Sequence, residues 1–373
     1  MHSPAAKVHS ALLLTQWCWG SAAVINKMGL SGVGMLPLFF AFLREICAAP
    51  ILFCILLSTR WALKRRRVAI DRDGRDLAIA GDVDSDHVSE VGSSSSRIGE
   101  RALRLLPGIF IFIDQACSLT GVTLADPVSA AAWQPSQVIF TTAISALLGM
   151  EVLTMRKGIG ILLTVGGALC LVFLSSDAAG STGPSPMIGN VFFFSNCLAS
   201  SLEVIIWRKL LCHATSPIEG FGVMAESYLV AACLMALACI ATSYSPAATD
   251  FFCPECHGDP WHLPPQALWS VAYSIVFQTV VGYCAQAWAL CYAESSLVAL
   301  YATIQPITAS VFTCALLACG FNPHGVLRWP GKEMIGALLI IIGLMIVECR
   351  RNDATCFARH SSSQCEINPI SQS

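Results

Sequence analysis

The feature that most limits the fold of this chain is a series of ten predominantly apolar runs, most of them close to twenty residues long. A helix needs about 20 apolar residues to cross a membrane, whereas a closed barrel would need alternating strands. The run 159–174 shows no such alternation, and only 12% of the residues are charged, against about 25% in soluble domains. The sequence therefore predicts an all-α membrane protein with ten transmembrane helices, at 9–28, 36–58, 105–124, 128–148, 157–175, 187–207, 218–242, 266–291, 297–319 and 332–348.

The second and third predicted helices are separated by the longest polar segment of the chain, 60–104. It opens with the basic cluster Lys64–Arg67 and then becomes acidic and serine-rich over 71–100. Such a composition cannot bury enough apolar surface to order itself, so we predict a disordered cytosolic loop. Basic residues beside a membrane helix usually set topology, and we therefore expect no nucleic-acid partner.

The distribution of Lys and Arg predicts the orientation of the chain. If the N-terminus is cytosolic, eighteen of the 22 Lys and Arg residues lie on the inner side. Only Lys27, Arg328 and Lys332 then lie on the outer side, and Arg44 lies within the membrane. Because cytoplasmic loops are enriched in Lys and Arg, both termini are predicted to be cytosolic.

Most of the 18 cysteines lie inside apolar runs, where a thiol behaves as a small hydrophobe. The exception is Cys253-Pro-Glu-Cys256-His257, which matches the spacing of covalent haem attachment, but a single match in an inter-helix loop favours a local disulfide or two free thiols over haem. The chain has no Gly-Lys-Ser/Thr phosphate loop, no His-Glu-x-x-His helix and no Gly-x-Ser-x-Gly elbow. We therefore expect no enzymatic activity, no catalytic residue, no metal and no cofactor.

The two halves of the sequence are similar to each other. At an offset of 171 residues, Gln134-Pro135 recurs as Gln305-Pro306, Gln115-Ala116 as Gln286-Ala287, and Gly149 as Gly320. At an offset of 176, Ile159-Gly160 matches Ile335-Gly336 and Gly167 matches Gly343; fainter matches are Val24-Ile25 with Val204-Ile205 and Glu45 with Glu226. Five helices per copy is an odd number, so the second copy would enter the membrane in the opposite orientation. Inverted repeats of this kind are found in many secondary transporters, with the binding site between them.

These motifs resemble the EamA branch of the drug/metabolite transporter superfamily, and most closely its plant-type Walls Are Thin-related and nodulin-like carriers. The resemblance rests on Phe39–Glu45, on Pro135–Glu151 with Gly160–Phe173, and on the second copy, Gln305–Gly320 with Gly336–Val347. It implies two inverted five-helix repeats and the transport of a small organic solute. Two features depart from the family pattern. The second loop is longer than usual, and the second copy has no acidic residue that matches Glu151. Family membership does not identify the solute.

Four ionisable residues are predicted to lie within the membrane, where such groups usually have a function or a partner: Arg44, Glu45, Asp114 and Glu226. Arg44 and Glu45 are adjacent, so they point about 100° apart on a helix. We therefore expect Arg44 to pair with another residue, and Asp114 is the first candidate. Two interpretations of such a pair stay open: it is a static structural ion pair, or it takes part in binding solute or transferring protons. Glu151, Glu203 and Glu294 are placed near the inner surface and are expected to be solvated or to extend their side chains to the surface, without a catalytic role.

Polar and aromatic side chains in the predicted helices are candidates for lining a solute site. The recurring pairs Gln115/Gln286 and Gln134/Gln305 favour a polar cavity, although hydrogen bonding between helices would also explain buried amides. Pro135 and Pro306 leave the carbonyl groups four residues earlier without donors, which predicts kinks suited to gating. The predicted substrate-binding residues are Gln16, Trp19, Gln115, Gln134, Asn196, Gln286 and Gln305.

We therefore interpret the chain as a secondary transporter of an amino acid, an auxin-like acid or another small metabolite, acting by alternating access. The alternative is a receptor, scaffold or enzyme that uses the same helical body. The predicted units are 1–178 and 179–350, one repeat each, followed by a cytosolic tail, 351–373. The expected partners are a small solute and the lipid bilayer, and a homodimer is left open. The sequence places the protein in the plasma membrane or in a vacuolar or other endomembrane.

Overall fold

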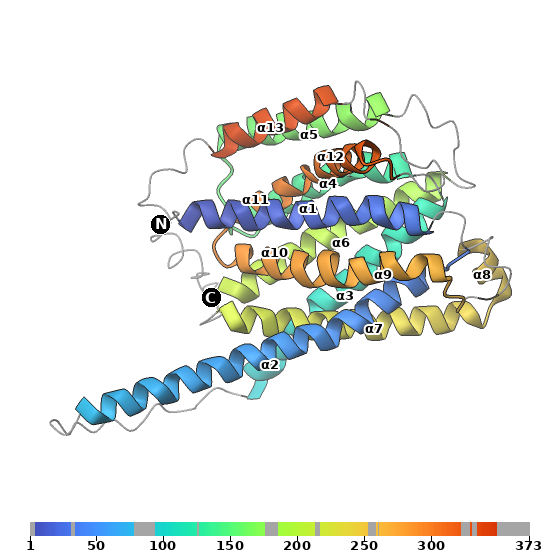
Figure 1. The fold of residues 1–373 in the computed structure, drawn as a ribbon. Helices are drawn as coiled ribbons and strands as arrows, with labels where there is room; N and C mark the ends of the chain where they lie inside the picture. The colour runs from blue at the N-terminus through green and yellow to red at the C-terminus, as the bar shows by residue number, and fades with distance from the viewer. Residues whose placement is uncertain are drawn as a thin grey trace.

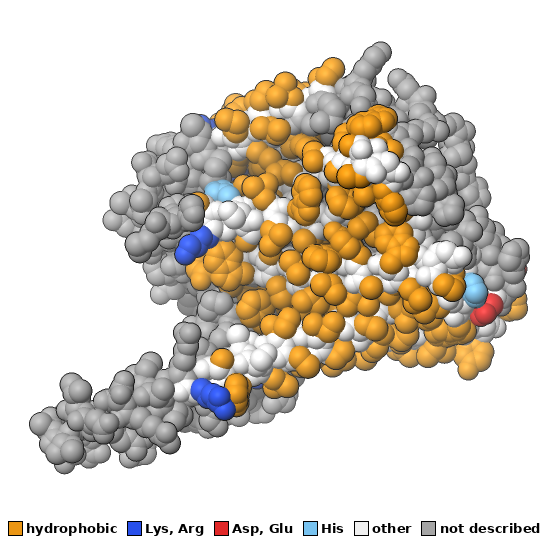
Figure 2. All heavy atoms as spheres, viewed as in Figure 1, with side chains coloured by type: hydrophobic (Ala, Val, Ile, Leu, Met, Phe, Trp, Pro, Cys, Tyr) orange, Lys and Arg blue, Asp and Glu red, His pale blue; other side chains and the backbone are white. Residues whose placement is uncertain are grey.

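The computed structural model describes residues 4–30, 34–77, 94–124, 127–175, 186–212, 217–252, 259, 261–321, 329 and 334–348. Within these residues every regular element is a helix, which confirms the predicted all-α fold. Six helical segments there are long and apolar enough to cross a membrane: 37–62, 103–121, 187–211, 220–243, 265–290 and 295–318. In Figure 2 apolar side chains cover the middle of the visible face, with Lys, Arg and a His at one end and a second His beside an acidic side chain at the other.

Each of the ten predicted apolar runs overlaps a helix or a series of consecutive helical elements. The first half of the chain forms α1 (Pro4–Leu30), α2 (Pro37–Leu77), α3 (Ser94–Leu124), α4 (Pro127–Leu147) and α5 (Met155–Ser175). The second half begins with α6 (Pro186–Cys212), α7 (Pro217–Ser243) and the short α8 (Pro246–Phe252). It continues with a run of helical elements, namely η3 (Pro265–Ala267), α9 (Leu268–Tyr273), η4 (Ser274–Gly282) and α10 (Tyr283–Leu290). The last helices are α11 (Ser295–Ala302), α12 (Gln305–Ala318) and α13 (Met334–Glu348).

The ends of several helices are set by proline and glycine. Proline is the first residue of α1, α2, α4, α6, α7 and α8, where its missing N–H has no helical partner in any case. At the other end, α4 is followed by Gly149 (φ 67°) and α12 by Gly320 (φ 72°). The N–H groups at 149 and 150 donate to the carbonyl groups of 146 and 145, and those at 320 and 321 donate to 317 and 316. Both are Schellman caps, and they lie at matching positions of the two halves.

The helices pack as one bundle with two outer pairs (Figure 1). The pair α5 and α13 lies at one edge of the bundle, and α2 packs against α7 at the other. Between these edges α3 packs against α6 and α7, α4 against α6, and α1 against α12, η4 and α10. The largest group of buried apolar side chains includes Leu12, Leu52, Trp207 and Leu290, so helices of both halves share one core.

The predicted disordered loop 60–104 is helical at both of its ends. Helix α2 continues to Leu77, beyond the main body of the bundle in Figure 1, and α3 already begins at Ser94. Residues 78–93 lie outside the described part of the chain. At the start of this extension Arg65 lies 3.6 Å above the ring of Trp61, one helical turn earlier, a contact that favours the helix there. The prediction of disorder rested on the acidic stretch and did not take the helix-forming residues at its border into account.

The two prolines predicted to kink their helices lie in different surroundings. Pro135 is inside the continuous helix α4, whereas the corresponding segment of the second half is interrupted. There α11 ends at Ala302, a turn follows at 303–304, and Pro306 is in the first turn of α12. A second irregularity is η4, a π-helix of nine residues. Irregular turns of this kind occur often at functional sites.

Candidate functional site

Arg44 and Glu45 form a buried ion pair on α2. Arg44 is 3% exposed and Glu45 is fully buried, and Arg44 Nη2 lies 3.6 Å from Glu45 Oε1. The expectation that adjacent residues could not pair is therefore wrong, because the long arginine stem brings the guanidinium back to its neighbour. Asp114 forms no ion pair with it within the described part of the chain, although the charge of Arg44 also acts on that carboxylate.

Asp114 of α3 is held by two side-chain amides. Asn196 of α6 donates to Asp114 Oδ1 at 2.7 Å and to its backbone carbonyl at 2.9 Å. Gln115 donates to Asp114 Oδ2 at 3.0 Å. Asn196 is buried, whereas Asp114 and Gln115 are half-buried near the middle of their helix. Three of the predicted site residues therefore form one hydrogen-bonded group between the two halves of the chain.

Glu203 of α6 is a buried carboxylate that sequence reasoning misplaced. It was expected to be solvated near the inner surface, but its exposed fraction is 3%. It lies within electrostatic range of Asp114 and Glu45, and no hydrogen-bond donor contacts its side chain among the residues described. A signal was available, because Glu203 follows Asn196 by seven residues and so shares its helix face. We call Arg44, Glu45, Asp114 and Glu203 the central cluster.

Aromatic side chains adjoin the central cluster. Tyr283 of α10 lies within electrostatic range of Glu203, Asp114 and Arg44. Its ring centroid is 5.1 Å from that of Tyr228 on α7, 5.1 Å from Trp19 on α1 and 6.0 Å from Trp207 on α6. The indole N–H of Trp19, a predicted site residue, donates to the backbone carbonyl of Gln278 in the π-helix at 3.1 Å. We call Trp19, Trp207, Tyr228 and Tyr283 the aromatic group.

The other predicted polar residues are distributed along the bundle. Gln16 on α1 and Gln286 on α10 are buried, and the side-chain oxygen of each has no hydrogen-bond partner among the described residues. Gln134 and Gln305 are half-buried beside the two prolines. Glu226 is half-buried on α7 and forms no ion pair within the described ranges. Cys253, Cys256 and His257 lie outside the described residues.

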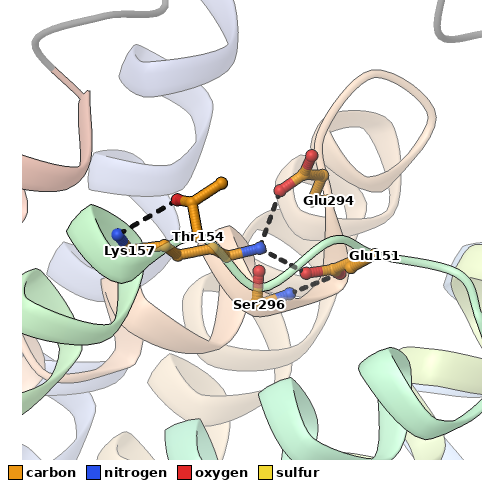
Figure 3. Close-up of polar contacts among 5 residues, drawn as sticks. All are labelled: Glu151, Thr154, Lys157, Glu294 and Ser296. Carbon is orange, nitrogen blue, oxygen red and sulfur yellow. Dashed lines mark hydrogen bonds and ion pairs between the residues drawn. The ribbon is translucent and has the colours of Figure 1, made fainter.

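A second charged group joins two loops at one end of the bundle (Figure 3). Lys157 Nζ, at the start of α5, lies 2.6 Å from Glu151 Oε2 and 2.9 Å from Glu294 Oε2. The other oxygen of Glu151 accepts a hydrogen bond from the backbone N–H of Ser296 on α11 at 3.0 Å. Glu151 is 7% exposed, so the expectation that it would be solvated is wrong. We call these four residues the Lys157 clamp, and they link the α4–α5 loop of the first half to α11 of the second.

Within the described part of the chain, no three His, Cys, Asp or Glu side chains lie close enough together to hold a metal ion. The carboxylates of the central cluster are thus not part of such a group.

The helical fold, the apolar helices and the mid-helix charges define this chain as a multi-pass integral membrane protein. No protein-family model matches it. A solved structure described only as a crystal structure of a protein has the same fold, with a TM-score of 0.61 over 94% of this chain and 98% of its own length. The two sequences are 15% identical, so the likeness concerns the fold alone.

Proposed function

We propose that this protein is a secondary carrier that moves a small organic solute across a membrane by alternating access. The observation that carries the proposal is the central cluster. Buried charges inside membrane helices are costly and usually mark a solute or ion pathway. Here they come from both halves of the chain, with Arg44, Glu45 and Asp114 in the first half and Glu203 in the second.

The proposal includes ten membrane spans arranged as two inverted repeats, 1–178 and 179–350. Reciprocal packing of α5 and α13 supports it. A Cβ atom added at Gly160 would lie 2.9 Å from the carbonyl oxygen of Gly343, and one at Gly167 would lie 2.8 Å from that of Gly336. The sequence match pairs Gly160 with Gly336 and Gly167 with Gly343. Gly160 therefore contacts the counterpart of Gly167, and Gly167 contacts the counterpart of Gly160, as a two-fold axis between the halves requires.

The contacts of α4 and α12 provide a second, independent support for the repeat. Gln137 Nε2 on α4 donates to Ser200 Oγ on α6 at 2.8 Å. The matching positions are Thr308 on α12 and Gly20 on α1, and Thr308 Oγ1 donates to the carbonyl oxygen of Gln16 at 2.8 Å. A Cβ atom added at Gly20 would lie 2.8 Å from the carbonyl oxygen of Gln305. Helix α4 thus packs on α6 as α12 packs on α1.

We further propose that the chain is related to the EamA carriers, has both termini in the cytosol, and resides in the plasma membrane or an endomembrane. The repeated motifs and the excess of Lys and Arg on one side support this assignment. In an alternating-access cycle the Lys157 clamp would close the cytosolic end, because it joins loops of opposite halves. Pro135 and Pro306, with the break before α12, would be points of bending.

Transport can be tested with purified protein in liposomes. The vesicles are loaded with an equimolar mixture of amino acids, organic acids and amines, and efflux is followed by mass spectrometry with and without a pH gradient. We expect selective efflux of a few compounds from liposomes containing the wild-type protein. Empty liposomes and liposomes containing Arg44→Met are the controls. Equal efflux from all three would exclude a carrier for these solute classes and favour a receptor or scaffold.

A further inference from the structure

The part of α2 that leaves the bundle carries the densest positive charge in the sequence. Five of the eight residues from 60 to 67 are Lys or Arg, and the first acidic residue after them is Asp71. The helix passes through this segment without interruption, from Pro37 to Leu77. Figure 2 shows Lys or Arg side chains exposed where α2 leaves the bundle. We call the five residues the basic segment: Arg60, Lys64, Arg65, Arg66 and Arg67.

Two arginines of the basic segment have described side chains, and both are exposed. Arg65 lies over the ring of Trp61, and Arg60 lies against α7, with Nη2 3.6 Å from the position of a Cβ atom built on Gly222. Within the described part of the chain, neither arginine forms a hydrogen bond or an ion pair. Both guanidinium groups are therefore open to a partner outside this part of the chain.

Other cations that are predicted to be cytosolic bind to groups of the protein itself. At the start of α5, Lys157 pairs with two carboxylates, and Arg156 Nε donates to the carbonyl oxygen of Ile346 at 2.9 Å. Near the end of α6, Arg208 Nη1 donates to the carbonyl oxygen of Leu290 at 2.5 Å. These side chains hold helices together, whereas α2 presents its cations outward.

The basic segment lies at the depth of the lipid headgroups. The apolar part of α2 that is long enough to cross a membrane ends at Ala62. Arg67 is five residues further on, roughly 8 Å along the helix. The headgroup layer of one leaflet is about 5–8 Å thick. Exposed Trp61 marks the border, as aromatic side chains do at membrane interfaces. Asp71 lies roughly 13 Å beyond Ala62, and so in the aqueous phase.

The spacing of the basic segment concentrates positive charge on one side of the helix. Positions 60, 64 and 67 follow one another at intervals of four and three residues, so they share one face. Such neighbours are about 5–6 Å apart. A phosphatidylserine headgroup brings one net negative charge, whereas a phosphorylated inositol ring brings several at one place. Guanidinium groups also bind two phosphate oxygens at once.

We propose that the basic segment binds the headgroup of a polyphosphoinositide in the cytosolic leaflet. Positions 60, 64 and 67 supply the positive charge, and Trp61 fixes the depth of the helix in the interface. The inference goes beyond solute transport and uses the proposed cytosolic position of this segment, because anionic lipids are enriched in that leaflet. A role in topology alone would need the charges on the cytosolic side but would give no preference among anionic lipids.

The experiment measures lipid binding to the full-length protein in nonionic detergent. The probes are short-chain phosphatidylinositol bisphosphate, phosphatidylserine and phosphatidylcholine, all with the same acyl chains. We expect the phosphoinositide to bind at least about tenfold more tightly than phosphatidylserine, a difference of about 1.4 kcal/mol. Phosphatidylcholine should bind most weakly. Raising the salt concentration from about 0.1 M to about 0.5 M should weaken phosphoinositide binding severalfold, because the charges are exposed to solvent.

A triple variant tests the face of the helix. Arg60→Gln, Lys64→Gln and Arg67→Gln together should weaken phosphoinositide binding at least about tenfold, because each cation near the surface contributes to it. Thermal unfolding shows whether the variant is folded. If it is not, a photoreactive phosphoinositide on the wild-type protein decides the question. Peptide-resolved mass spectrometry should then find the label on the peptide that contains 60–67, and labelling elsewhere alone would contradict the site.

A second triple variant is the control for net charge. Lys7→Gln, Arg72→Gln and Arg75→Gln remove three cations that lie at the start of α1 and further along α2, outside the basic segment. Phosphoinositide binding should remain close to that of the wild type. Equal losses in the two triple variants, or equal affinities for phosphoinositide and phosphatidylserine, would overturn the inference. If the phosphoinositide binds as expected but liposomes show no solute flux, the lipid site stands and the carrier function fails.

Discussion

Gly343 of α13 lies against the backbone of α5, with its Cα directly facing Gly160 and Thr164. A Cβ atom at position 343 would lie 2.7 Å from the backbone nitrogen of Thr164 and 2.8 Å from the carbonyl oxygen of Gly160. Real Cβ contacts are not this short, so α5 and α13 owe their close approach to glycine. Small residues play this part in membrane helix pairs, where packing replaces the hydrophobic effect.

Gly343→Ala should destabilise the protein. The added methyl group meets backbone atoms that cannot move aside, so the two helices must separate, at a cost of about 1–3 kcal/mol. Thermal unfolding in detergent measures the effect. Gly166→Ala on α5 is the matched control, because no described atom lies within 4 Å of its added Cβ, and it should be neutral or slightly stabilising. Equal melting temperatures for the two variants would contradict the close packing.

Arg44→Met should destabilise the bundle by about 3–5 kcal/mol, because it leaves Glu45 buried without its cation. Arg44→Met combined with Glu45→Gln should recover part of this loss, since neither charge remains. Thermal unfolding and the monodisperse fraction in size-exclusion chromatography report the outcome. If Arg44→Met combined with Asp114→Asn recovers as much stability, the ion pair between Arg44 and Glu45 contributes no more than the interaction of Arg44 with Asp114.

Lys157→Gln should loosen the end of the bundle that the Lys157 clamp holds. The variant leaves Glu151 buried without its cation, while Glu294 retains its place on the loop. We expect faster alkylation of Cys291, a half-buried thiol three residues before Glu294, measured by peptide-resolved mass spectrometry. The control is Lys7→Gln, which removes an exposed lysine at the start of α1. The clamp has no gating role if both variants react at the wild-type rate.

Pro135→Ala and Pro306→Ala should slow turnover severalfold while expression and solute binding remain near normal. Alanine restores a backbone donor and removes the ring that crowds the preceding turn. The effect of Pro306→Ala should be the larger one, because the chain is already interrupted at 303–304. Transport rates in proteoliposomes, compared with equilibrium binding in detergent, separate turnover from affinity. Wild-type rates in both variants would reduce the prolines to packing elements.

The orientation can be tested with engineered glycosylation sites, since the natural sequence has no Asn-x-Ser/Thr acceptor. An acceptor placed in 244–262 should be glycosylated in the endoplasmic reticulum, because that segment is predicted to face the lumen. An acceptor placed in 71–98 should remain unmodified. Electrophoresis before and after enzymatic deglycosylation reads both results. The reverse pattern would overturn the predicted cytosolic termini.

Apolar length alone was enough to predict the helices, because each run must satisfy its own backbone in lipid. Pairings between side chains were harder. Lys157 and Glu294 are 137 positions apart, and no local pattern announces their contact. The prediction that Arg44 and Glu45 would not pair was wrong for the opposite reason. The two residues are neighbours in sequence, and ideal helix geometry ignores the reach of a flexible guanidinium. Glu203 could have been found from its spacing to Asn196, but its position near a predicted helix end suggested solvent.

The caps that end α4 and α12 have a consequence for which substitutions these positions tolerate. Gly149 and Gly320 have positive φ angles, yet no atom of the described residues lies within 4 Å of a Cβ built on either residue. An L side chain is therefore disfavoured at these two positions by the backbone conformation, and not by a lack of space. A D-alanine would fit both places without strain, whereas every encoded residue with a side chain carries the opposite chirality. Among the encoded residues, glycine therefore suits these two turns best, and asparagine is the nearest substitute.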